Sequence, residues 1–206
     1  MSTVTRRPAG VSPGDELDVR EVHLDDPLVR PLLEDLAHEY ATRYSDHLTE
    51  EELLCEMSEY PAEDFAAPHG RLLLVLAAGV PVAGGAYRRR TEPELGDLAR
   101  SAHPEAARAA DGSPAVPTAE LKRIWTHNAH RRRGLARLVL TELERRAGQN
   151  GYERIYLTTG PRQPEAAGLY LSAGYAPLYD PAAQPGQTGQ PGQPGPLAFE
   201  KWLCPR

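Results

Sequence analysis

Apolar residues recur along the chain with two different periods. In four segments they recur at three- and four-residue steps, which predicts amphipathic helices over residues 27–43, 49–59, 135–149 and 165–173. The first of these helices follows Pro27, a residue that the first helical turn tolerates. The second begins with Thr49 and Glu52 in the spacing of a capping box.

Shorter apolar or alternating runs separate these segments. They predict strands over residues 18–23, 71–77, 80–88, 119–126, 154–159 and 197–203. Ala78 and Gly79 lie between the second run and the third, which is typical of a hairpin. The predicted order is strand, two helices, two strands, strand, helix, strand, helix, strand, strand, where the next-to-last strand has no range of its own and the last is residues 197–203. This order indicates an α/β fold.

The chain has 206 residues, enough for one hydrophobic core, since single domains usually run to about 100–200 residues. We expect a flexible N-terminus over residues 1–17 and a single domain over residues 18–206. Two segments within that domain are poor in core-forming residues. They predict an insertion loop over about residues 91–118 and a Pro/Gly/Gln-rich loop over about residues 181–196.

Composition argues against several classes of protein. The chain is 40% apolar and 25% charged, and its apolar runs fall short of the roughly 20 residues that span a bilayer, so we expect no membrane partner. The N-terminus lacks the apolar stretch of a secretory signal, and Cys55 and Cys204 lie far apart, which fits free thiols in the cytoplasm. A net charge of −6 argues against binding to nucleic acid.

The segment Arg131-Arg132-Arg133-Gly134-Leu135-Ala136 lies between a predicted strand and a predicted helix. A loop that opens a helix presents free backbone N–H groups and the positive end of the helix dipole, which suits a phosphate. Gly134 lets a ligand approach the backbone closely, and Ala136 is small. The spacings of P-loops and of dinucleotide-binding loops are both missing.

This segment resembles the pyrophosphate-binding signature of the GNAT acetyltransferase family, Gln/Arg-x-x-Gly-x-Gly/Ala, through Arg131, Gly134 and Ala136. The resemblance covers about residues 119–176 and includes AELKRIWT and GYERIYLTTGPRQPEAAGLYLSAGY. It implies the GNAT fold, a single mixed, mostly antiparallel central sheet flanked by helices. In that fold the central strands splay apart and hold acetyl-CoA, the co-substrate.

The resemblance also implies which residues contact acetyl-CoA. Main-chain groups of Ile124, Trp125 and Thr126 would pair with the pantetheine arm. The pyrophosphate would bind to the amides of Arg131, Arg132, Arg133, Gly134, Leu135 and Ala136. Gln163 stands where the family commonly has an asparagine at the start of the last helix, and it is the remaining expected contact.

Acetyl transfer to a primary amine requires a base for the amine, a polarised thioester carbonyl and an acid for the departing sulfur. Glu120 is the candidate base, because its strand would border the thioester; alternatively it pairs with Lys122 or an arginine, and an ordered water is the base. Tyr170 matches a tyrosine that the family often places near the sulfur, so it is the candidate acid; alternatively it is a core residue. A backbone N–H near Ile124 would polarise the carbonyl.

Several other polar residues have two interpretations. His127 and His130 are three residues apart without a third ligand, so we expect no metal. The arginine runs over residues 88–90 and 131–133 have a simpler partner in the phosphates of CoA than in nucleic acid. An acidic stretch, Glu50, Glu51, Glu52, Glu56 and Glu59, is either a solvated face or an attraction for a cationic amine.

The leading interpretation is an acetyl-CoA-dependent N-acetyltransferase that acts on a small-molecule or peptide amine, with a homodimer as an open option. By resemblance Tyr40, Arg43 and Tyr44 border the acceptor pocket, although helical packing explains Tyr40 equally well. The alternative is a non-catalytic acyl-CoA-binding sensor or interaction module. That alternative needs the phosphate-binding loop but neither Tyr170 nor Glu120.

Overall fold

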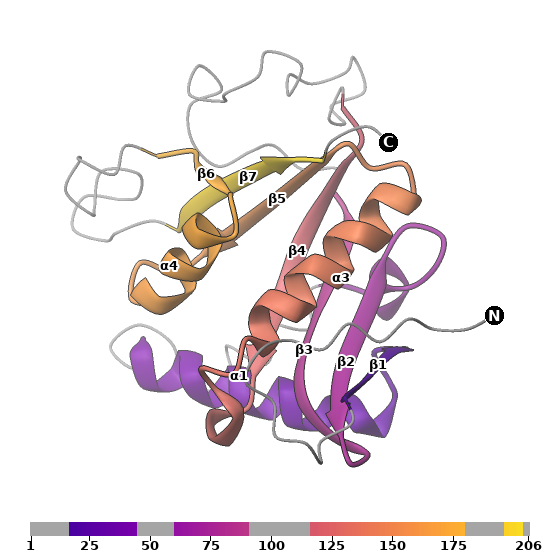
Figure 1. Cartoon of the computed structure of the whole chain (residues 1–206), viewed down its shortest axis with the longest axis vertical. Coiled ribbons are helices and arrows are strands. Elements are labelled where there is room, and N and C mark those ends of the chain that lie inside the picture. Colours follow the sequence, from indigo (N-terminus) through magenta and orange to yellow (C-terminus); the bar gives the residue numbers. More distant parts are fainter. Residues whose placement is uncertain (1–16, 45–59, 91–115, 180–195, 204–206) are drawn as a thin grey trace.

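The computed structural model describes residues 17–44, 60–90, 116–179 and 196–203, which form one seven-stranded sheet with three α-helices (Figure 1). The strands are β1 (Leu17–Val22), β2 (Arg71–Ala77), β3 (Val80–Arg89), β4 (Thr118–Thr126), β5 (Arg154–Thr159), β6 (Ala176–Pro177) and β7 (Leu197–Trp202). The helices are α1 (Arg30–Arg43), α3 (Leu135–Gln149) and α4 (Pro164–Ser172). Short 3₁₀ turns occur at Pro27–Val29, Ala62–Phe65 and Asn128–His130.

The strands lie in the order β1-β2-β3-β4-β5-β7-β6. β4 and β5 run parallel, whereas every other neighbouring pair is antiparallel. The sheet is therefore mixed and mostly antiparallel, which confirms the fold class expected from the sequence.

Helices cover both faces of the sheet. Figure 1 shows α3 lying across the strands and α4 beside β5 and β7. Leu73 and Val75 of β2 belong to the core under α3, whereas their neighbours Leu72 and Leu74 belong to the core under α1. This division follows from the strand geometry, since successive side chains point to opposite faces. No helix in the described ranges is long and apolar enough to cross a membrane.

Two adjacent glycines let β3 approach its neighbours on both faces. A Cβ at Gly84 would lie 2.8 Å from Leu32 Cδ1 of α1. A Cβ at Gly85 would lie 2.6 Å from Ile124 Cδ1 of β4 and 3.0 Å from Val139 Cγ1 of α3. The contacts of 2.8 and 2.6 Å are shorter than those that real Cβ atoms make, so a side chain at either position would push its neighbours away.

The observed elements agree with the predicted ones to within one or two residues in most cases. Leu17, expected in the flexible N-terminus, belongs to β1, and Thr118, expected at the end of the insertion loop, opens β4. The predicted helix over residues 49–59, and nearly all of the loops over 91–118 and 181–196, lie outside the described residues.

Candidate active site

The two parallel strands β4 and β5 separate along their length. They pair from Thr118 with Arg154 to Leu121 with Leu157, and β4 then continues to Thr126 without pairing to β5. The β5-facing edge of this second half of β4 therefore presents backbone groups that the sheet does not use. Such an edge is available to hydrogen-bond an extended ligand.

A β-bulge coincides with the point where the strands separate. Gly84 of β3 pairs with Trp125 and Ala86 pairs with Lys122, so Arg123 and Ile124 together stand opposite Gly85. Arg123 adopts a φ of 58°, in the left-handed region that residues with a Cβ rarely enter. A bulge adds one residue to a strand and redirects the side chains beyond it.

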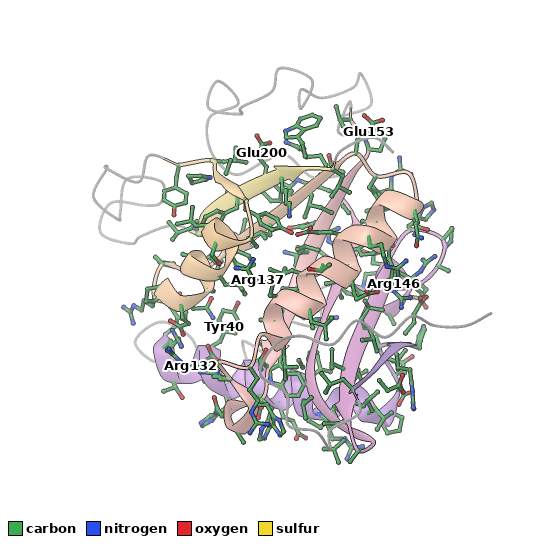
Figure 2. All side chains as sticks on the ribbon, viewed as in Figure 1. Tyr40, Arg132, Arg137, Arg146, Glu153 and Glu200 are labelled. Atoms are coloured by element: carbon green, nitrogen blue, oxygen red, sulfur yellow. The ribbon has the colours of Figure 1, made fainter. Side chains whose placement is uncertain are left out.

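The gap between β4 and β5 opens into a cavity of about 1020 Å³. Its walls come from the second half of β4, the start of α3, the end of β5, α4 and one face of α1. Figure 2 shows Tyr40, Arg132 and Arg137 around the space between α1, α3 and α4. The predicted contact residues that line this cavity are Ile124, Trp125, Thr126, Arg131, Arg132, Gly134, Leu135, Ala136 and Gln163, whereas Arg133 is not among them.

One end of the cavity is formed by the first turn of α3. Gly134 precedes the helix with a φ of 77°, and Arg132 also has a positive φ, 62°. No side chain caps this end of α3, and its first turn holds no acidic residue. Its backbone N–H groups and dipole are therefore available to an anion. We call residues 131–136 the loop end of the cavity.

The side chain of Arg131 forms an ion pair with α1. Its Nη2 donates to Glu39 Oε2 of α1 at 2.6 Å. Glu39 Oε1 also lies 3.1 Å from Arg43 Nη2, and Arg43 in turn pairs with Glu165 of α4. This chain of ion pairs ties α1 to the loop and to α4 across the cavity wall. The pKa of Glu165 is lowered mainly by its hydrogen bond from Arg43.

Tyr170 lines the cavity from α4 and is 6% exposed. Its ring packs against Tyr175 and Phe199, with centroids 5.8 and 5.6 Å away. Burial, and to a lesser extent nearby Tyr40, raises the pKa of the Tyr170 phenol above its ordinary value of 10. The phenol therefore keeps its proton at neutral pH, and it faces the space where a ligand would lie.

Glu120 lies among three cations on β3 and β4. Its Oε2 accepts from Arg88 Nη2 at 2.6 Å, while Oε1 lies 3.3 Å from Arg90 Nη1 and 3.0 Å from Lys122 Nζ. The side chain is 4% exposed and does not line the cavity. The geometry thus favours the second interpretation of Glu120, an ion-pair partner, over the role of a base.

Trp125 and Gln163 line the cavity and also form hydrogen bonds within the protein. Trp125 Nε1 donates to Asp35 Oδ2 of α1 at 3.0 Å. Gln163 precedes α4, and its Oε1 accepts from Thr159 Oγ1 at 3.0 Å and from the Gly160 backbone N–H at 3.2 Å. Gln163 therefore holds the β5–α4 connection in place beside the cavity.

The two histidines of the predicted loop contact each other. Their rings lie 5.8 Å apart, and His127 Nδ1 accepts from the backbone N–H of Ala129 at 3.3 Å. Within the described parts of the chain, no three His, Cys, Asp or Glu side chains lie close enough together to hold a metal ion.

Sequence reasoning missed several residues that line the cavity. Arg137 donates to Ser172 Oγ at 2.9 Å and to the Ser172 carbonyl at 3.1 Å, which joins α3 to α4. Glu39 and Glu165 line the cavity from α1 and α4. Arg137 directly follows the phosphate motif in the sequence, so its position could have indicated that it lies at the cavity. The two glutamates lie 126 residues apart in the sequence, and only the fold brings both beside Arg43.

Comparisons with known proteins identify the family. The model of the acetyltransferase (GNAT) family matches residues 31–175. No curated protein matches the chain. Among solved structures, an acetyltransferase from Thermus thermophilus is 19% identical with a TM-score of 0.55, and the match covers 91% of this chain and 97% of that one. An acetyltransferase from Streptococcus agalactiae is 16% identical with a TM-score of 0.55, over 93% and 100% of the two chains.

A third similar structure is the PaiA N-acetyltransferase from Thermoplasma acidophilum in complex with coenzyme A. It is 12% identical with a TM-score of 0.55, and the match covers 91% of this chain and 99% of that one. At these identities the structural matches establish a shared fold. The family model, in contrast, extends over more than half of the chain and includes α1, the bulge, the phosphate motif and Tyr170. The chain therefore belongs to the GNAT family of acetyltransferases and is an acyltransferase.

Proposed function

We propose that this protein transfers the acetyl group of acetyl-CoA directly to a primary amine of a small molecule or peptide. The observation that carries the proposal is the separation of β4 from β5 beside the uncapped first turn of α3. It creates one continuous cavity with an uncapped helix N-terminus at one end and an unused strand edge along its side. The structural relative from Thermoplasma acidophilum, which holds coenzyme A, supports this choice of co-substrate.

The cavity fits the parts of acetyl-CoA. The amides of residues 132–136 and the dipole of α3 suit its pyrophosphate, whereas the Arg131 amide already donates to the Asn128 carbonyl at 3.4 Å. The unused edge of β4, over Ile124 to Thr126, suits the amides of the pantetheine arm. The Thr126 hydroxyl lines the cavity, is buried and has no hydrogen-bond partner among the described residues, which fits a polar ligand there.

Bound acetyl-CoA supplies an activated acyl carbon. The amine nitrogen forms a bond to that carbon, the carbon–sulfur bond breaks, and the sulfur takes up a proton. Tyr170 holds a proton at the cavity wall and is our candidate donor to the sulfur. A backbone N–H near Ile124 would polarise the carbonyl oxygen. Because Glu120 is enclosed by cations, we assign removal of the amine proton to an ordered water.

The test compares two tyrosines that pack against each other. Tyr170→Phe removes the hydroxyl in the cavity, so we expect kcat to fall by about 100-fold while the KM for acetyl-CoA changes little. Tyr175→Phe is the matched control, since the Tyr175 hydroxyl bonds to Glu144 and does not line the cavity. Thiol release with a panel of amines measures both. Equal kcat values for Tyr170→Phe and wild type would remove Tyr170 from the chemistry.

A further inference from the structure

The bulge in β4 turns two successive cationic side chains to the same face of the sheet. In a regular strand Lys122 and Arg123 would point to opposite faces. In this structure Lys122 Nζ lies 5.0 Å from the ring centre of Tyr60, and the Arg123 guanidinium lies 4.3 Å from that of Phe65. The two rings themselves pack edge to face, 6.4 Å apart. Lys122 and Arg123 are thus neighbours on the face that α1 covers.

All four of these residues line the cavity. They form a cationic and aromatic wall, which we call the bulge end. It is distinct from the loop end, because Thr126 lies four positions along the strand from Lys122, roughly 13 Å away at about 3.3 Å per residue. The phosphates of acetyl-CoA would bind at the loop end, so the bulge end is not needed to neutralise them.

The cations of the bulge end have capacity for an anion. Lys122 shares Glu120 with two arginines, is 24% exposed, and has three donors on its ammonium group. Arg123 is largely buried, and this burial lowers the pKa of its guanidinium to about 10. The Arg123 guanidinium has five N–H donors, so it can bind a carboxylate in addition to the interactions that it already makes, and a planar carboxylate matches the fork of a guanidinium.

We infer that the acceptor is an amine that also carries a carboxylate, such as an amino acid, and that Lys122 and Arg123 bind this carboxylate at the bulge end of the cavity. The inference rests on the proposed function, which places the phosphates at the loop end and therefore the acetyl group toward the bulge. An acceptor bound at Lys122 and Arg123 then presents its amine beside the acetyl group. Lys122 and Arg123 are specificity-determining residues in this scheme.

The experiment uses matched pairs of acceptors that differ only in the carboxylate. Amino acids of different side chains are compared with their amides in an assay of thiol release. Binding of the same compounds to the protein loaded with free CoA is measured by calorimetry, which needs no turnover. A charge-assisted contact predicts that each accepted amino acid has at least about a tenfold lower KM and Kd than its amide.

Variants test whether the bulge end causes the preference for a carboxylate. Lys122→Met keeps the apolar stem over Tyr60 and removes the charge, so we expect it to lose most of the preference for the carboxylate. Lys122→Arg should restore it. The matched control is Arg145→Met, which removes an arginine that pairs with Glu142 on α3 and does not line the cavity. It should leave the preference unchanged.

The remaining outcomes overturn either the carboxylate assignment or the proposed function. Equal or better use of the amides or of simple diamines, or a preference that survives Lys122→Met, would overturn the carboxylate assignment and leave the acetyltransferase in place. Binding of acetyl-CoA with no transfer to, and no binding of, any amino acid would also overturn it. Failure to bind acetyl-CoA at all would overturn the proposed function itself.

Discussion

The two ends of the cavity are constructed in different ways. The loop end is a single contiguous segment, residues 131–136, which leads into the uncapped first turn of α3. At the bulge end, Lys122 and Arg123 come from β4, while Tyr60 and Phe65 come from a segment more than fifty residues earlier. The loop end depends on chain conformation and tolerates many side chains. The bulge end depends on which side chains are present, so it is the part of the cavity suited to selecting an acceptor.

The largest effect is expected on stability, from the buried ion pairs of Glu120 beside the bulge end. Glu120→Gln removes the carboxylate that Arg88, Arg90 and Lys122 share. Breaking a buried ion pair costs about 3–5 kcal/mol, so the free energy of unfolding should fall by about that amount. Chemical denaturation measures it.

The control for this variant is Glu165→Gln at an exposed pair, where a loss below about 1 kcal/mol is expected. The kcat that remains in Glu120→Gln distinguishes a structural role of Glu120 from a catalytic one. A Glu120→Gln protein with unchanged stability and a kcat lowered by orders of magnitude would make Glu120 the base after all.

A smaller effect is expected at the loop end from Glu39→Gln. This change frees Arg131 from its partner at 2.6 Å and removes a negative charge from the cavity wall. Acetyl-CoA should bind about two- to fivefold tighter, with a steeper dependence on salt, because exposed pairs are worth less than about 1 kcal/mol. Calorimetry at two salt concentrations checks this. Weaker binding would mean that Glu39 positions Arg131 for the phosphates.

The smallest expected effect is a flat pH profile. Because burial raises the pKa of Tyr170 above 10, its phenol stays protonated as the pH rises through that value. If Tyr170 is the acid, the titration of Tyr170 should not lower the kcat of the wild type between about pH 8 and pH 10. The pH profiles of the wild type and of Tyr170→Phe should therefore have the same shape in this range. A fall of the wild-type kcat in that range that is missing from Tyr170→Phe would mean that the pKa of Tyr170 is lower than the structure indicates.

The two ends also differ in how far the sequence predicts them. The period of the apolar residues located every described helix, and the strand–loop–helix setting of Gly134 identified the loop end, because both signals are contiguous in the chain. The bulge gives no such signal. Strand alternation places Glu120 and Lys122 on one face correctly, but it places Arg123 on the wrong one, since a single extra residue shifts the alternation of the side chains. The pairing of Arg43 with Glu165 was equally out of reach, because it depends on the packing of α1 near α4.

The most direct test of the account is a calorimetric comparison of acetyl-CoA with S-acetylpantetheine, which lacks the pyrophosphate. The wild type should bind acetyl-CoA at least about 100-fold tighter. Gly134→Asp, which adds a negative charge and a strained φ at the loop end, should lose most of that difference. Gly151→Asp, at a φ of 85° outside the cavity, should retain it. Equal affinities of the wild type for both compounds, or no binding of acetyl-CoA at millimolar concentration, would contradict the account.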